Sequence, residues 1–111
     1  MSSSDVLERL AATIKARRAA AADTSYTKQL LDAGAGKCAK KFGEEAVEAV
    51  IAAMGAQTAP LTAEAADVLY HLLVLLESRG VALTDVLAVL EARMGTSGLE
   101  EKAARPKGAN S

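Results

Sequence analysis

The sequence predicts an all-α protein, a helical bundle of four to five helices. Apolar residues recur at helical spacing along most of the 111 residues, and no stretch alternates apolar and polar residues as a strand would. Hydrophobic residues make up 50% of the chain and aromatic residues only 3%, so small aliphatic side chains fill the core and favour closely packed helices. Because such a core buries little area per residue, we expect the bundle to be assembled as a dimer.

The first two helices are expected to be marked by their caps. The first begins near Asp5, where Asp5-Val6-Leu7-Glu8 has the form of a capping box, and it fades into a run of alanines. After a polar break, Ser25 is expected to cap a short helix that ends near Gly34. Gly34 and Gly36 are expected to bracket a turn before the next helix.

Three further helices are expected in the rest of the chain. Residues 37–54 and 61–78 form two helices joined by a short loop, so they should lie antiparallel. The second of these is apolar almost all round, which is typical of a helix buried on most sides. Thr84 and Asp85 are expected to cap a last helix that continues to about Met94.

Length and composition limit the chain to one all-α domain, residues 1–95, followed by a flexible C-terminal segment, 96–111. The formal net charge of −1 provides no general attraction to nucleic acid or membrane, so neither partner is expected. Cys38 is the only cysteine, which excludes an intrachain disulfide and fits a reducing cytoplasm. The start of the chain lacks a signal pattern, and the longest apolar run, residues 68–76, is too short for a bilayer. We therefore expect a soluble, cytoplasmic protein.

Five acidic residues on two neighbouring helices are the main functional signal: Glu44, Glu45, Glu48, Glu64 and Asp67. At about 100° per residue, the first three share an arc roughly 100° wide, and the last two share one face of the next helix. Their neighbours are apolar, with no base at helical offsets inside either cluster. Carboxylates crowded in this way raise one another's pKa values and need a cation, and a hard divalent metal is the simplest one. The competing interpretation is a solvated acidic edge.

Four segments of the chain occur in the order shown by a known family: Ser25-Tyr26-Thr27, residues 41–48 (KFGEEAVE), residues 64–73 (EAADVLYHLL) and residues 97–102 (SGLEEK). In these segments the chain resembles phosphoribosyl-ATP pyrophosphohydrolase, which acts at the second step of histidine biosynthesis. The spacing of the acids marks the wider superfamily of all-α nucleoside triphosphate pyrophosphatases, which includes MazG-type enzymes and dimeric dUTPases. The first segment, Tyr70-His71 and Ser97-Gly98 resemble the phosphoribosyl-ATP branch specifically. Phe42 departs from the family, where a small aliphatic residue is more usual.

The resemblance implies a homodimer that hydrolyses the α–β phosphoanhydride of phosphoribosyl-ATP, giving phosphoribosyl-AMP and pyrophosphate. Water would attack with the help of Mg²⁺, or alternatively Mn²⁺, held by carboxylates. The residues that match the metal-binding positions of the family are Glu44, Glu48, Glu64 and Asp67. Glu45 and Glu48 are the catalytic candidates, and Glu45 either completes the metal shell or orients the attacking water.

Four basic residues are candidates for contacts with the substrate phosphates: Lys41, Arg93, Lys102 and Arg105. For Lys41 the competing interpretation is an ordinary helical ion pair with Glu44, and for the other three it is a solvated basic tail. His71 is either a packed, hydrogen-bonded core residue or a support for the acids. The segment 25–27 is either a helix cap or a substrate contact.

Two other functions remain open from the sequence. The same acids could serve a house-cleaning pyrophosphatase of the MazG type that acts on free nucleoside triphosphates. A non-catalytic helical dimerisation module is a second alternative, although it would have to bury five unpaired acids for no chemical purpose.

Overall fold

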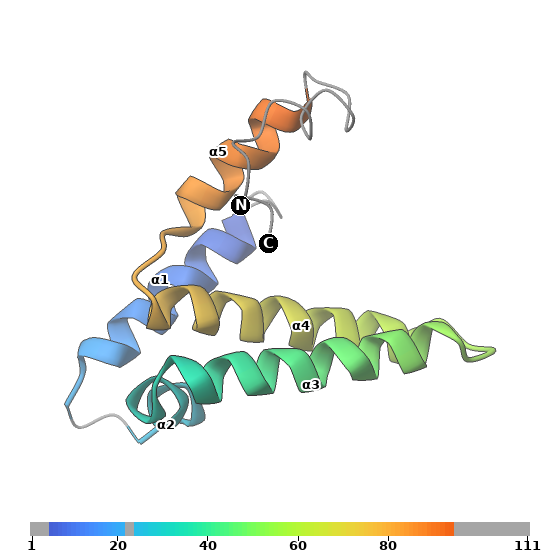
Figure 1. The fold of residues 1–111 in the computed structure, drawn as a ribbon, viewed down its shortest axis with the longest axis horizontal. Helices are drawn as coiled ribbons and strands as arrows, with labels where there is room; N and C mark the ends of the chain where they lie inside the picture. The colour runs from blue at the N-terminus through green and yellow to red at the C-terminus, as the bar shows by residue number, and fades with distance from the viewer. Residues whose placement is uncertain (1–4, 22–23, 95–111) are drawn as a thin grey trace. The chain divides into compact units, whose positions relative to one another are not determined.

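The computed structural model describes residues 5–21 and 24–94 of the chain. Within these residues all the regular secondary structure is helical: α1 (Asp5–Ala19), α2 (Tyr26–Ala33), α3 (Ala35–Ala53), α4 (Ala59–Ser78) and α5 (Leu83–Met94) (Figure 1). The prediction of an all-α fold is therefore confirmed. The chain divides into two compact units, of which the first ends at Val81 and contains α1 to α4. The described part of the second unit contains α5, and the C-terminal segment 96–111 lies outside the described residues.

The first unit is built on an antiparallel hairpin of α3 and α4, which pack along each other more extensively than any other pair of helices (Figure 1). Pro60 lies in the first turn of α4, where a backbone N–H is not needed for the helix. At the other end of the hairpin, α3 begins at Ala35, two residues earlier than predicted. Gly34 alone makes the turn, with φ of 99°, a conformation that favours glycine, and Gly36 is helical.

The short helix α2 packs against α1, α3 and α4. The predicted cap is confirmed, since the Ser25 hydroxyl accepts a hydrogen bond of 3.2 Å from the backbone N–H of Lys28. The helix ends at Gly34, whose N–H donates to the carbonyl of Leu31. Local signals thus determine both ends of α2.

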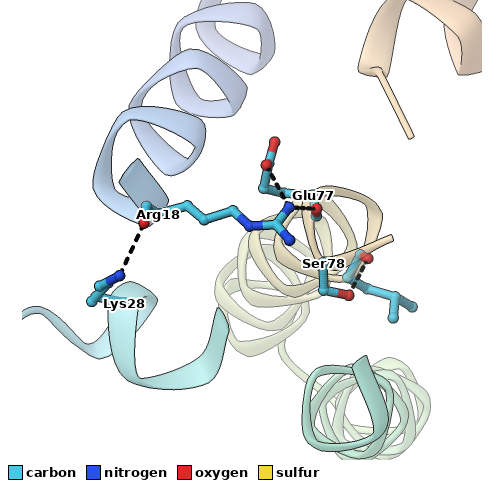
Figure 2. Close-up of polar contacts among 5 residues, drawn as sticks. Arg18, Lys28, Glu77 and Ser78 are labelled. Atoms are coloured by element: carbon cyan, nitrogen blue, oxygen red, sulfur yellow. Dashed lines mark hydrogen bonds and ion pairs between the residues drawn. The ribbon is translucent and has the colours of Figure 1, made fainter. Parts of the chain in front are cut away.

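Arg18 links the last turn of α1 to the C-terminal end of α4 (Figure 2). Its guanidinium donates to the backbone carbonyl of Glu77 and to the Glu77 carboxylate at 2.9 Å. Lys28 of α2 donates to the backbone carbonyl of Arg18 at 2.9 Å, and the Ser78 hydroxyl donates to the carbonyl of Leu75 at 2.6 Å. Because an exposed ion pair contributes only about 0–1 kcal/mol, these contacts orient three helix ends more than they stabilise the fold.

The core of the first unit is small. Its buried apolar side chains are Ile14, Leu30, Leu31, Cys38, Leu73 and Val74. The Cys38 thiol donates to the carbonyl of Leu30 at 3.3 Å, and burial raises the pKa of this thiol. The expectation that residues 61–78 are buried on most sides is wrong for a single chain, since three residues of α4 are buried and Leu69 is 44% exposed. Apolar surface on the hairpin is thus left without cover by the described part of the chain.

Among the described residues, α4 is long and apolar enough to cross a membrane by length and composition alone. The core helices of soluble proteins pass the same test, so one such helix is weak evidence for a span. In addition, α4 contains Glu64 and Asp67, and acidic side chains in the hydrocarbon layer are costly. We therefore interpret α4 as the central helix of the bundle.

Candidate active site

Three carboxylates from the two hairpin helices converge on one point. Glu45 and Glu48 are three residues apart and share a face of α3, and the antiparallel packing brings Glu64 of α4 to them. One carboxylate oxygen from each lies within 4.8 Å of the other two. Ligand oxygens of one octahedral Mg²⁺ ion lie ~2.9 to ~4.2 Å apart, so small side-chain rotations would close the three around such an ion.

The other two acids differ in their surroundings. Asp67 is exposed, and its negative charge contributes to raising the pKa values of Glu45 and Glu64, so it lies close to the cluster. Glu44 instead pairs with Lys41 at 3.2 Å, and its side chain is 49% exposed. The structure therefore brings Glu45 rather than Glu44 into the group of three.

The charged forms of Glu45 and Glu64 are destabilised by their acidic neighbours. The pKa of Glu45 is raised, first because it shares a hydrogen bond with Glu48, then by burial and by the neighbouring negative charges. The pKa of Glu64 is raised mainly by burial and then by the charges of Glu48 and Asp67. Oε2 of Glu64 is also buried without a hydrogen-bond partner among the described residues. A buried, unpaired carboxylate oxygen beside other acids fits a divalent cation, which would satisfy it and offset the repulsion.

His71 lies beside this cluster and is 5% exposed. Its Nε2 is 3.7 Å from Oε1 of Glu45, whose side chain is 18% exposed. The ring meets two aromatic neighbours edge-on, Tyr70 at 4.9 Å and Tyr26 at 6.1 Å between centroids. Burial and the positive charge of Lys41 lower the pKa of His71, so the ring is neutral at pH 7. The Tyr70 hydroxyl hydrogen-bonds to that of Thr27 at 2.5 Å.

These contacts connect residues 25–27 with the Tyr70-His71 pair. The sequence left two interpretations open for residues 25–27 and two for His71, and it did not show that these segments meet. Residues 25–27 do cap α2, and in addition Tyr26 and Thr27 contact the Tyr70-His71 pair on α4. The contacts depend on how α2 packs, which no local pattern reveals. The only signal in the sequence was that both segments resemble the same family branch.

The four basic candidates for phosphate contacts lie in different parts of the chain. Lys41 is on α3 with Glu44, and the pKa of its ammonium group is raised, first by the hydrogen bond to Glu44 and then by neighbouring negative groups. Arg93 lies in the last turn of α5, in the second unit. Lys102 and Arg105 lie outside the described residues. Lys41 is therefore the candidate for which the structure shows a position near the acids.

Comparison with known proteins gives a consistent result. Residues 7–94 match the family model described as phosphoribosyl-ATP pyrophosphohydrolase. A protein named phosphoribosyl-ATP pyrophosphatase from Cereibacter sphaeroides is 63% identical over 100 residues, which cover 90% of this chain and 97% of the relative. Proteins of the same name from Ruegeria pomeroyi and Rhodobacter capsulatus are each 59% identical, over 93% and 89% of this chain and 98% and 96% of their own lengths. The match includes α2 to α5, all of α1 but its first two residues, and every acid of the site.

Proposed function

This chain belongs to the phosphoribosyl-ATP pyrophosphohydrolase family, and we propose that it hydrolyses phosphoribosyl-ATP at the acids of α3 and α4. As a hydrolase of the second step of histidine biosynthesis, it releases phosphoribosyl-AMP and pyrophosphate. The observation that supports this site most directly is the convergence of Glu45, Glu48 and Glu64 within 4.8 Å. Carboxylates repel the phosphates of the substrate, so this cluster can bind such a substrate only if a cation lies between the carboxylates and the phosphates.

The donor set fits Mg²⁺, with Mn²⁺ as an alternative, because all its ligands are hard oxygens. Glu45, Glu48 and Glu64 would hold the ion, and Asp67, whose charge acts on Glu45 and Glu64, would join them. When bound, the ion would neutralise the phosphate chain and make a water molecule more acidic. Glu44 has a different part in this proposal, which is to hold Lys41.

The reaction itself needs a water oxygen to attack the α-phosphorus while the bond to the bridging oxygen breaks and pyrophosphate leaves. Glu45 and Glu48 are the residues that we propose orient this water and accept its proton on a carboxylate oxygen, since the raised pKa of Glu45 and its hydrogen bond with Glu48 suit a general base. Lys41 would exchange its contact with Glu44 for a phosphate oxygen of the substrate. Arg93, Lys102 and Arg105 remain candidates for the other phosphates.

Pyrophosphate release tests the function. We expect kcat/KM for phosphoribosyl-ATP to exceed that for dUTP or dCTP by at least about 100-fold, and a chelator to abolish turnover of all three. The control is restoration of turnover by excess Mg²⁺ after chelation. A preference for dUTP or dCTP would support the house-cleaning alternative. The absence of turnover on any of the three, with or without Mg²⁺, would favour the dimerisation module.

We also propose a homodimer that uses an apolar stripe on α3. The stripe consists of Val47, Val50, Ile51 and Met54, which recur at helical spacing and are between 58% and 80% exposed. Val50 lies about 140° around the helix from Glu45, so covering the stripe would leave Glu45 accessible, whereas Ile51 lies about 60° from Glu48 and places the stripe beside the site. Large contiguous apolar surfaces on a soluble protein mark interfaces, and the small core of this chain makes a second copy the simplest cover.

Ile51→Asp is expected to convert the dimer into a monomer at micromolar concentration, because it places a charge in the centre of the stripe. Sedimentation velocity measures the change. Val6→Asp is the matched control, since Val6 is an equally apolar, 49% exposed residue on α1. Monomeric wild-type protein, or an Ile51→Asp variant that remains dimeric, would contradict the proposal.

A further inference from the structure

We propose that His71 is a positioning residue, which holds the Glu45 carboxylate in the orientation required for binding a divalent ion. The inference rests on the metal site proposed above and adds a residue that does not itself touch the ion. It also gives a role to the contacts between α2 and α4, because Tyr26, Thr27 and Tyr70 hold the His71 ring in place.

The first argument is the distance and burial of the pair. Nε2 of His71 lies 3.7 Å from Oε1 of Glu45, and both side chains are largely shielded from water. A shift of less than about 1 Å in either side chain would bring the two atoms within hydrogen-bonding distance. Glu45 has no basic partner of its own in the described structure comparable to that of Glu44, which pairs with Lys41. His71 is thus the group that can steer this carboxylate.

The second argument concerns the two ring nitrogens. Nδ1 of His71 is buried and has no hydrogen-bond partner among the described residues. A neutral imidazole carries one N–H and one acceptor nitrogen. If the hydrogen were on Nδ1, a buried donor would be unpaired while a lone pair faced a carboxylate, and both are unfavourable. The proton therefore belongs on Nε2, where the Glu45 carboxylate can accept it.

The third argument is that the ring is held from two sides. Tyr70 and Tyr26 meet it edge-on, at interplanar angles of 74° and 87°. The hydroxyl of Tyr70 bonds to Thr27 in the first turn of α2, immediately after the Ser25 cap. The ring is therefore fixed by edge-on aromatic contacts from α2 and α4, and the bond between Tyr70 and Thr27 holds one of these neighbours in place. Side chains that fix the orientation of a metal ligand commonly change metal affinity 10–100-fold when removed.

Two isosteric substitutions separate positioning from simple packing. The amide nitrogen of Gln can occupy the place of Nε2, whereas that of Asn reaches only the place of Nδ1, and both residues are neutral and polar. We expect His71→Asn to weaken Mn²⁺ binding by about 10–100-fold and His71→Gln to stay within about threefold of the wild type. Isothermal titration calorimetry with Mn²⁺ on the full-length protein gives the dissociation constants, and metal-free melting curves show whether each variant folds.

The outcomes are distinct. Equal Mn²⁺ affinities for wild type and His71→Asn, or equal losses for the Asn and Gln variants, would overturn the inference while leaving the metal site intact. Wild-type protein that binds no Mn²⁺ would overturn the proposed metal site, and this inference with it. Should His71→Asn fail to fold, Tyr70→Phe removes only the hydroxyl bonded to Thr27 and is expected to weaken Mn²⁺ binding about fivefold. An unchanged affinity in Tyr70→Phe would then count against positioning.

Discussion

Glu45→Gln is expected to lower kcat/KM for phosphoribosyl-ATP by about 10³-fold, equivalent to ~4 kcal/mol of transition-state stabilisation. The same change one residue earlier, Glu44→Gln, is expected to cost less than about tenfold. The reason is that Glu45 belongs to the group of three carboxylates, whereas Glu44 pairs with Lys41 and is half exposed. An amide has the shape of the carboxylate but not its charge, so it is a poor ligand for a hard cation and a poor base.

The adjacent pair of variants provides its own control, because both lose one negative charge from the same turn of α3. Steady-state kinetics of pyrophosphate release at saturating Mg²⁺ measures the effect, with melting curves to show that both variants are folded. If Glu44→Gln suffered the larger loss, Glu44 would be the metal ligand, as the resemblance to the family implies. α3 would then be rotated about its axis relative to the structure.

Mg²⁺ is expected to raise the melting temperature of the protein by roughly 10 °C at a concentration of 100 times its dissociation constant. A ligand that binds only the folded state stabilises it by ~2.7 kcal/mol under that condition, and a chain of this length gains about 4 °C per kcal/mol. Thermal melts in chelator and in Mg²⁺, at one protein concentration, provide the measurement. A melting temperature indifferent to millimolar Mg²⁺ would contradict the metal site.

The stability of the protein, with and without Mg²⁺, is expected to depend on pH. The pKa values of Glu45 and Glu64 are raised in the folded protein, so protonation of these groups favours the folded state. This contribution is fully present below the ordinary glutamate pKa of about 4.3 and is lost as the pH rises through the raised values. The metal-free protein therefore loses this contribution as the pH rises from about 4 through the raised values, whereas stabilisation by Mg²⁺ grows over the same range because the ion requires ionised ligands.

Glu64→Gln tests the contribution of one carboxylate of the cluster separately from that of the other acids of the chain. In chelator at pH 7 the variant is expected to melt above the wild type, because a neutral amide removes the repulsion by Glu48 and Asp67. In Mg²⁺ the order should reverse, since the variant lacks a ligand. Glu8→Gln on α1 serves as the control and should leave the response to Mg²⁺ unchanged. Identical responses in wild type and Glu64→Gln would remove Glu64 from the site.

The sequence by itself determined which segments are helical, and it singled out the acids of α3 and α4 as the candidate site. The Ser25 cap and the Gly34 turn depend on contacts within about four residues along the chain, so local patterns suffice to find them. The spacing of the acids likewise limits them to one face of each helix. Gly36 is an exception, because the sequence does not distinguish a glycine inside a helix from a glycine in a turn.

Only the tertiary structure decided how these faces meet. Glu44 and Glu45 are 100° apart on the same turn, and the rotation of α3 against α4, set by side-chain packing over the whole hairpin, turns Glu45 toward Glu64. The contact between His71 and Glu45 and the link from Tyr70 to Thr27 join residues 26 and 43 positions apart in the chain. Such pairings arise from the packing of three helices at once, and periodicity along any one of them carries no information about it.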